Sequence, residues 1–231
     1  MTDPPKLSFY KEYPKTCDPE DFWGQVKRTV NGKPIPQEQI DMIVDAVYNG
    51  LELSTNDTLL DLCCGNGALT TYFFALCSGG LGVDFSEYLV EVAHKHFVKR
   101  PQEDFIIQDV VEFARTYSEA KRLTKAVCYG SWQYLPKYEA HKLLFLLRQR
   151  FTGLQKIFIG NVPDKKFARS FFGDHYEPGI ENTPTGAIGI WWTLEEFRAL
   201  AEETSWRMVI HYMPKDFYWA HYRYDVILLP D

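Results

Sequence analysis

The sequence predicts a single α/β domain whose seven-stranded, mostly parallel sheet has helices on both faces. The length of 231 residues suits one such domain with additions, and its 45% apolar residues suffice for a sizeable core. Short apolar runs alternate with amphipathic segments, which is typical of parallel strands joined by helices. The last two strand segments follow each other directly, so we expect them to form an antiparallel pair at the edge.

The elements follow in a regular order. A helix is predicted to begin near Pro36 and to end at Gly50, with its apolar stripe on Ile40, Ile43, Val44 and Val47. A later helix is predicted over 193–204, because Thr193 and Glu196 form a capping box. The predicted strand and helix pairs are 58–63 with 67–77, 80–84 with 86–98, 104–108 with 110–119, and 124–129 with 137–151; the remaining strands are 156–160, 206–213 and 222–229.

Two additions to this domain of residues 1–231 are predicted. Residues 1–50 form an N-terminal cap, whose first part is rich in proline and has no clear period. Residues 161–192 form an insertion after the fifth strand, longer than the roughly 12–15 residues of an idle connection. Ligands of open α/β sheets bind beyond the carboxyl ends of the strands, which both additions can reach. We therefore expect residues 161–192 to be an active-site lid that is mobile without ligand.

The stretch Asp61-Leu-Cys-Cys-Gly-Asn-Gly carries the strongest functional signal. It reads as the end of a buried strand, a glycine turn and the start of a helix, the layout of a nucleotide-cofactor loop. Asp84 ends the next apolar strand, where a carboxylate can accept hydrogen bonds from both hydroxyls of a ribose. Asp61 would repel the pyrophosphate of a dinucleotide. It favours a ligand with an ammonium group and no phosphate, such as S-adenosylmethionine (SAM).

The segment from about Leu59 to Pro136 resembles the class I SAM-dependent methyltransferases, which have a Rossmann-like fold. The likeness rests on the glycine turn, on Asp84, and on Asp109 after the third strand, although Cys63 stands where the family usually has its first glycine. The resemblance implies SAM as cofactor, S-adenosylhomocysteine as product and no metal. It implies that the cofactor is bound by Asp61, Gly65, Asn66, Gly67, Asp84, Phe85, Asp109, Val110 and Gly130.

Other candidate site residues lie outside the glycine turn. Arg28 is either a bidentate partner for the SAM carboxylate or a solvated charge. Trp132 and Gln133 follow the fourth strand, where the family contacts cofactor and substrate, but Trp132 could equally be a core residue. Asn161 ends the fifth strand and could orient an acceptor. His175, between Asp174 and Glu177 in the predicted lid, is the candidate catalytic base, with a solvated loop histidine as the alternative.

Composition narrows the function further. The net charge of −6 argues against nucleic acid as partner, and no apolar run approaches the roughly 20 residues that span a bilayer. The amino terminus lacks the apolar core of a secretory signal, and five cysteines without metal-ligand spacing favour a cytoplasmic protein.

We therefore expect a methyltransferase that acts at O or N of a small-molecule or sugar-like metabolite, with the oligomeric state undetermined. Methylation of RNA or protein is one alternative, since the N-terminal segment holds several lysines. A SAM-binding regulatory or catalytically inactive partner protein is another.

Overall fold

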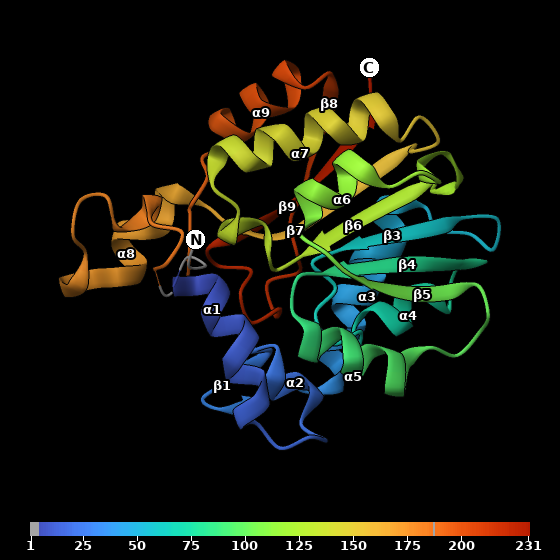
Figure 1. Cartoon of the computed structure of the whole chain (residues 1–231). Coiled ribbons are helices and arrows are strands. Elements are labelled where there is room, and N and C mark those ends of the chain that lie inside the picture. The colour runs from blue at the N-terminus through green and yellow to red at the C-terminus, as the bar shows by residue number, and fades with distance from the viewer. Residues whose placement is uncertain (1–4, 187) are drawn as a thin grey trace.

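A seven-stranded sheet forms the centre of the protein in the computed structural model, which describes residues 5–186 and 188–231 (Figure 1). The strand order is β5-β4-β3-β6-β7-β9-β8. Strands β3 to β7 pair in parallel, whereas β9 is antiparallel to both β7 and β8. The fold predicted from the sequence is confirmed. The strands are β3 (Thr58–Leu62), β4 (Gly79–Asp84), β5 (Glu103–Ile107), β6 (Lys125–Tyr129), β7 (Lys156–Pro163), β8 (Trp206–His211) and β9 (Arg223–Pro230).

Helices cover both faces of this sheet, and each face has its own hydrophobic cluster (Figure 1). On one face, Phe113, Leu143 and Phe197 are fully buried. On the other face, Ile40 and Phe73 are fully buried. The first face carries α6 (Val110–Thr116), α7 (Lys137–Arg150) and α9 (Leu194–Glu203); the second carries α3 (Gln37–Leu51), α4 (Thr70–Phe74) and α5 (Glu87–Phe97).

Helix α3 differs from its prediction at its carboxyl end. The helix continues through Gly50 to Leu51, and Glu52 takes the left-handed conformation after it. Gly50 is needed for packing, since a Cβ there would lie 2.7 Å from the Phe158 ring. The expected helix stop at Gly50 is therefore wrong: the missing side chain lets α3 approach β7. Of residues 1–50, only those before α3 lie outside the two layers of helices that cover the sheet.

The N-terminal segment before α3 is compact and is anchored to the glycine turn. Asn66 Nδ2 donates to the Phe22 carbonyl at 2.8 Å and to Gln25 Oε1 at 2.9 Å. Asn66 and Gln25 are both buried, so this amide pair fixes the segment over the turn. Its elements are α1 (Pro5–Glu12), the short 3-10 turn η1 (Tyr13–Thr16), α2 (Phe22–Gln25), and the hairpin of β1 (Thr29–Val30) and β2 (Lys33–Pro34); residues 1–4 lie outside the described residues.

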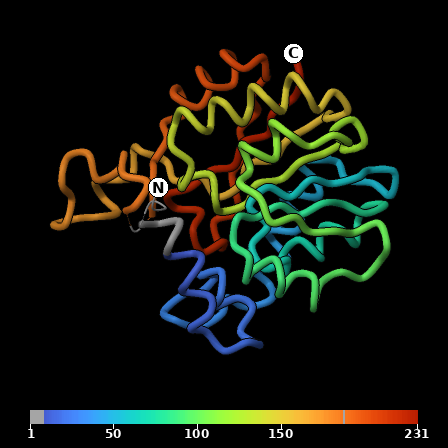
Figure 2. Tube along the Cα trace, in the orientation of Figure 1, coloured from blue at the N-terminus to red at the C-terminus, as the bar shows by residue number. Residues whose placement is uncertain are grey.

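Residues 161–192 contain more regular structure than the sequence predicts. Strand β7 extends to Pro163, and Trp191 and Trp192 are buried. The rings of Phe171 and Tyr222 pack around Trp191, with centroids 5.2 and 5.7 Å from it. This part of the chain extends to one side of the sheet (Figure 2). Its elements are η4 (Lys165–Phe167), α8 (Ala168–Phe172), η5 (Gly173–His175) and η6 (Ile180–Asn182), while Ala187 lies outside the described residues.

The connection between β8 and β9 is longer than expected and packs on α3. The Tyr218 amide donates to Gln39 Oε1 at 2.9 Å, and Gln39 Nε2 donates to the Asp216 carbonyl at 3.2 Å. Phe217 is buried in the same cluster as α3.

Two further 3-10 turns, η2 (Ala120–Arg122) and η3 (Trp132–Tyr134), flank β6. None of the helices in the described part of the chain is long and apolar enough to cross a membrane.

Candidate active site

A cavity of about 290 Å³ lies at the carboxyl ends of β3, β4 and β6. Its wall combines the glycine turn, the loop after β6, the N-terminal segment, and Pro184 and Thr185 from residues 161–192. Of the residues predicted to bind a cofactor, the following line it: Arg28, Asp61, Gly65, Asn66, Asp84, Phe85, Asp109, Val110 and Gly130.

The glycine turn has a left-handed backbone at Cys63 and at Gly65, with φ of 60° and 58°. Only glycine adopts this conformation without strain, which gives a physical reason for a glycine at the position of Cys63 in the related family. Cys63 is held there by packing against the first hydrophobic cluster. At Gly65 a Cβ would come within 3.0 Å of Val26, so the N-terminal segment closes directly onto the turn.

Asp61 lies at the end of β3, buried in the cavity floor. Its Oδ2 accepts a 2.6 Å hydrogen bond from Thr70 Oγ1. Burial and the nearby Asp84 carboxylate raise the pKa of Asp61 to about 7, and the Thr70 hydrogen bond and the Arg28 charge act against this rise. Asp61 is thus a carboxylate that a cationic group would strongly stabilise.

Asp84 is oriented by the backbone around it. Its Oδ2 accepts from the Gly65 amide and its Oδ1 from the Ser86 amide, both at 2.9 Å. Burial raises its pKa to about 6, and these amides act in the opposite direction. Because each carboxylate oxygen can accept two hydrogen bonds, Asp84 is fixed in place and can still accept from a ligand.

Arg28 places its guanidinium in the cavity wall, 5.3 Å from the Tyr129 ring centroid. Among the described residues, its side chain forms no hydrogen bond and no ion pair, and its Nε is buried without a partner. Burial lowers the pKa of Arg28, while the charges of Tyr129 and Asp61 oppose that change. A guanidinium that makes no hydrogen bond or ion pair with the described residues is a ready binding group for a carboxylate or phosphate.

The other end of the cavity is formed after β4 and β5. Phe85 and Val110 give it two apolar walls. Asp109 caps α6, with its Oδ1 accepting from the amides of Val111 at 2.9 Å and Glu112 at 3.0 Å. This end suits a flat apolar ring with a polar edge.

Three predicted residues support the cavity from behind. A Cβ on Gly67 would lie 2.9 Å from the Phe105 ring, so Gly67 serves the packing of the turn on the sheet. Trp132 is buried against Phe197, with ring centroids 5.7 Å apart. Gln133 Nε2 donates to the Gly130 carbonyl at 2.8 Å and so holds the loop after β6.

Asn161 and His175 do not line the cavity. Asn161 has a left-handed backbone, with φ of 65°, and its amide donates to Asp225 Oδ1 at 2.7 Å. It lies behind Gly130, where a Cβ would be 3.8 Å from Asn161 Nδ2. His175 is exposed in η5. Its role as a base stays a prediction that this arrangement does not support.

Aromatic residues complete the wall, and sequence reasoning gave no site role to three of them. These three are Tyr10, Trp23 and Tyr129, which line the cavity together with Tyr134. The hydroxyls of Tyr10 and Tyr134 lie 3.3 Å apart and their ring centroids 5.5 Å apart. No local pattern marks Tyr10, whereas the position of Tyr129 at the carboxyl end of a central strand was a usable signal.

Comparison with known proteins gives the fold an independent reference. No family model matches the chain. An uncharacterised methyltransferase of Schizosaccharomyces pombe is 31% identical over 77 residues, which cover 33% of this chain and only 28% of that protein.

Solved structures resemble the chain over much more of its length. Magnesium protoporphyrin IX methyltransferase from Synechocystis, with bound S-adenosylhomocysteine, aligns with a TM-score of 0.65, at 14% identity and 98% of each chain. A SAM-dependent methyltransferase from Clostridium acetobutylicum aligns with a TM-score of 0.64 at 13% identity, and the alignment covers 90% of this chain and 96% of that chain. A small RNA methyltransferase also aligns with a TM-score of 0.64 at 14% identity, and the alignment covers 86% of this chain and 26% of that chain. The chain therefore has the fold of the class I SAM-dependent methyltransferases.

Proposed function

We propose that the protein is a SAM-dependent methyltransferase. The observation that carries this proposal is the pair of opposite charges at one end of the cavity. Asp61 is a buried carboxylate with a raised pKa, and Arg28 is a guanidinium that makes no hydrogen bond or ion pair with the residues that the structure describes. An α-amino acid carries an ammonium and a carboxylate on one carbon, so these two side chains fit the methionine part of SAM.

The remainder of the cavity fits the rest of that molecule. Asp84 would accept from the ribose hydroxyls, and Phe85 and Val110 would enclose the adenine, with Asp109 at its edge. A Cβ on Gly130 would make ordinary van der Waals contact with Arg28 Nη2 and Asn161 Nδ2, each 3.8 Å away. When bound, SAM supplies a methyl group activated by a sulfonium. The protein's part is to hold the acceptor in line, to exclude water and, where needed, to take up a proton.

For the acceptor, we propose an oxygen or nitrogen of a small molecule. Several aromatic side chains line the cavity, among them Tyr10, Trp23 and Tyr134, and the net charge is −6. RNA is the second candidate, because one structure of the same fold is a small RNA methyltransferase. A cytoplasmic location follows as a prediction from the reduced cysteines.

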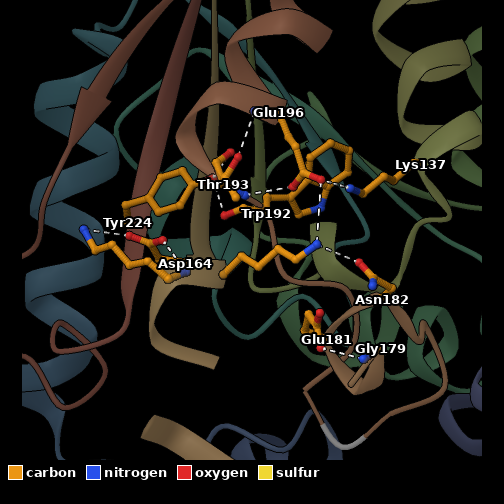
Figure 3. Close-up of polar contacts among 11 residues, drawn as sticks. Lys137, Asp164, Gly179, Glu181, Asn182, Trp192, Thr193, Glu196 and Tyr224 are labelled. Atoms are coloured by element: carbon orange, nitrogen blue, oxygen red, sulfur yellow. Dashed lines mark hydrogen bonds and ion pairs between the residues drawn. The ribbon is translucent and has the colours of Figure 1, made fainter. Parts of the chain in front are cut away.

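We also propose that residues 161–192 act as a lid. Pro184 and Thr185 reach the cavity from the turn that follows η6. That turn is held by a polar network in which Lys165 Nζ donates to Asn182 Oδ1 at 3.0 Å (Figure 3). Such contacts at the surface are weak enough to open and close.

Binding of S-adenosylhomocysteine tests the proposed function. We expect micromolar-scale affinity by calorimetry and a raised melting temperature, with no effect of NAD. Asp61→Ala should abolish binding, whereas the exposed Asp45→Ala on α3 should bind as the wild type does. Wild-type affinity in Asp61→Ala would remove the basis for this site. Binding without turnover of any acceptor would favour a regulatory or inactive partner protein.

A further inference from the structure

We propose that the protein has a second ligand site, separate from the active-site cavity, which binds a small molecule with a planar aromatic ring and a carboxylate. The site is a cavity between the hairpin of β1 and β2, helix α8 and the connection from β8 to β9. Its existence does not depend on the proposed function.

The second cavity has a volume of about 640 Å³, which lies within the range of roughly 300–1,000 Å³ that is usual for small-molecule sites. The hairpin contributes Lys33 and Pro34 to its wall, α8 contributes Phe171, and the connection contributes Tyr218 and Trp219. Among the described residues, none lines both this cavity and the active-site cavity. A ligand bound here is therefore neither the proposed cofactor nor its methyl acceptor.

Contacts with the core hold the aromatic wall of the second cavity in place. Tyr222 is buried, and its ring centroid lies 4.7 Å from that of Phe171 and 5.7 Å from that of Trp191. Trp219 packs edge-on against the buried Phe217, with ring centroids 5.4 Å apart. Because the fold fixes these rings, the cavity is preformed.

The same wall leaves aromatic surface open to solvent. Phe171 is 40% exposed and Tyr218 is 43% exposed, and both border this one cavity. Exposed apolar side chains that gather around a cavity mark a binding site. Since aromatic rings pair with other flat rings in offset or edge-to-face geometry, a planar aromatic group suits this wall.

The charge of the wall favours an anion. Of the described residues that line the cavity, Lys33 and His221 have basic side chains and none is acidic. The Lys33 side chain is exposed and forms no hydrogen bond or ion pair with the described residues. One ammonium group matches the single negative charge of a carboxylate. A cationic ligand could stack on the rings, but Lys33 would repel it and no carboxylate of the wall would pair with it.

The hairpin lies between the two cavities. Arg28 lines the active-site cavity, and Thr29 and Val30, which follow it directly, line the second one. The Ile35 amide donates to the Arg28 carbonyl at 3.3 Å and so joins the two ends of the hairpin. A ligand in the second cavity therefore contacts the segment that positions Arg28 without entering the active site.

Ligands with a similar planar frame and different charge test the ligand class. Cinnamate, cinnamamide and cinnamylammonium are titrated by calorimetry into the protein without cofactor. We expect cinnamate to bind about threefold or more tightly than the amide, as one partly exposed ion pair allows, and the ammonium to bind most weakly. No binding of cinnamate at millimolar concentration overturns the proposal, and so does equal or tighter binding of the amide or the ammonium.

Variants at exposed positions assign this binding to the second cavity. Lys33→Gln should abolish the preference for cinnamate over cinnamamide, because it removes the ammonium group. Tyr218→Ala should weaken the binding of both ligands about threefold or more, because it removes an aromatic wall. An unchanged preference in Lys33→Gln, or unchanged affinities in Tyr218→Ala, contradicts the proposal.

The matched controls are Lys215→Gln and Tyr212→Ala, which replace an exposed lysine and an exposed tyrosine of the same connection. Neither residue lines the second cavity, so both variants should bind cinnamate and cinnamamide as the wild type does. A loss of affinity in these controls equal to that in the test variants would place the probes elsewhere on the surface and overturn the proposal. Melting temperatures check that all four variants are folded.

Titration of cinnamate in the presence of S-adenosylhomocysteine separates the two cavities. A probe in the active-site cavity would show an apparent dissociation constant that rises in proportion to the S-adenosylhomocysteine concentration, whereas two distinct sites give a change that levels off. We expect the second behaviour, and a proportional rise overturns the proposal. If S-adenosylhomocysteine itself does not bind, the proposed function fails, and the probes and variants still decide whether the second site exists.

Discussion

The two halves of the cavity are built in different ways. The proposed cofactor half consists of the carboxyl ends of β3, β4 and β5, and its carboxylates Asp61 and Asp84 are fixed by groups close in the chain. The proposed acceptor half is assembled from α1, the loop after β6 and residues 161–192, and Tyr10 meets Tyr134 across 124 positions of sequence.

This difference separates a fixed half from an adjustable one. Strand ends buried in a sheet cannot move without disrupting the core, so they suit a ligand that is the same in every reaction cycle. The acceptor half is held by a few polar and aromatic contacts at the surface, which can change with the substrate at a small cost in stability.

Among substitutions that keep Asp61, the largest effect should come from Arg28. Arg28→Met should weaken binding of S-adenosylhomocysteine about 10- to 150-fold, because a charged hydrogen-bonded partner of the methionine carboxylate contributes roughly 1.5–3 kcal/mol. Calorimetry measures the loss, and Arg207→Met serves as the surface control. If Arg28→Met binds as tightly as the wild type, the guanidinium is not part of the cofactor half.

The cofactor half should also depend on pH. The pKa of Asp61 is about 7 and that of Asp84 about 6, so lowering the pH from 8 to 5.5 protonates both carboxylates. Because the ligand ammonium prefers the ionised form of Asp61, affinity should fall about 10- to 30-fold over this range. Asp61→Asn should remove most of this dependence.

The ligand-free protein should show the opposite trend in stability. The folded pKa of each acid lies above its unfolded value, so the native state binds more protons between about pH 4 and 7. The contribution of the two acids to the stability of the folded state is fully present below their unfolded pKa, and it is lost as the pH rises through their folded pKa. Thermal melts from pH 5 to 8 should therefore show a larger ligand-induced shift at higher pH, and a constant shift would contradict the assigned pKa values.

A smaller effect is expected in the acceptor half, at the network around Glu196. Glu196 Oε1 lies 2.6 Å from Lys137 Nζ and 3.9 Å from Lys165 Nζ, which in turn binds Asn182 (Figure 3). Glu196→Gln can keep the capping box of α9 and loses the charge. Hydrogen exchange in residues 176–186 should accelerate about two- to fivefold, since partly exposed ion pairs contribute about 0.2–1 kcal/mol.

Lys166→Gln is the matched control for that network, because Lys166 pairs with Asp164 and not with Glu196. Equal exchange in residues 176–186 for Glu196→Gln and the wild type would mean that this wall is held by its aromatic packing. Equal exchange with and without ligands would mean that the segment is a fixed wall and not a lid.

The smallest effect should come from His175. Its side chain is exposed and does not line the cavity, so His175→Ala should change kcat by less than about twofold. A loss of about 10²–10⁴ with unchanged SAM affinity would instead support the base role suggested by the sequence, and would require η5 to close over the cavity. Single-turnover rates at saturating SAM make this comparison.

The sequence by itself determined the sheet, most element boundaries and most of the residues that line the proposed cofactor half. Strand and helix periodicity, the turn from Asp61 to Gly67, and the acids at strand ends are local signals, and parallel topology brings strand ends together without further information. Cys63 stands where the resembled family usually has a glycine, and its backbone is left-handed, which is strained for a cysteine. Packing against the first hydrophobic cluster holds Cys63 in this conformation.

Only the tertiary structure decided the acceptor half and the fine packing. Gly50 reads as a helix stop and instead allows α3 to approach Phe158. For Trp132 the sequence left both a pocket and a core position open, and the structure places it in the core. The partners of Tyr10, Arg28 and Asn66 come from distant segments, and nothing in their neighbouring residues encodes them. Such contacts depend on how complete elements pack, which is a property of the folded chain and not of a short stretch of sequence.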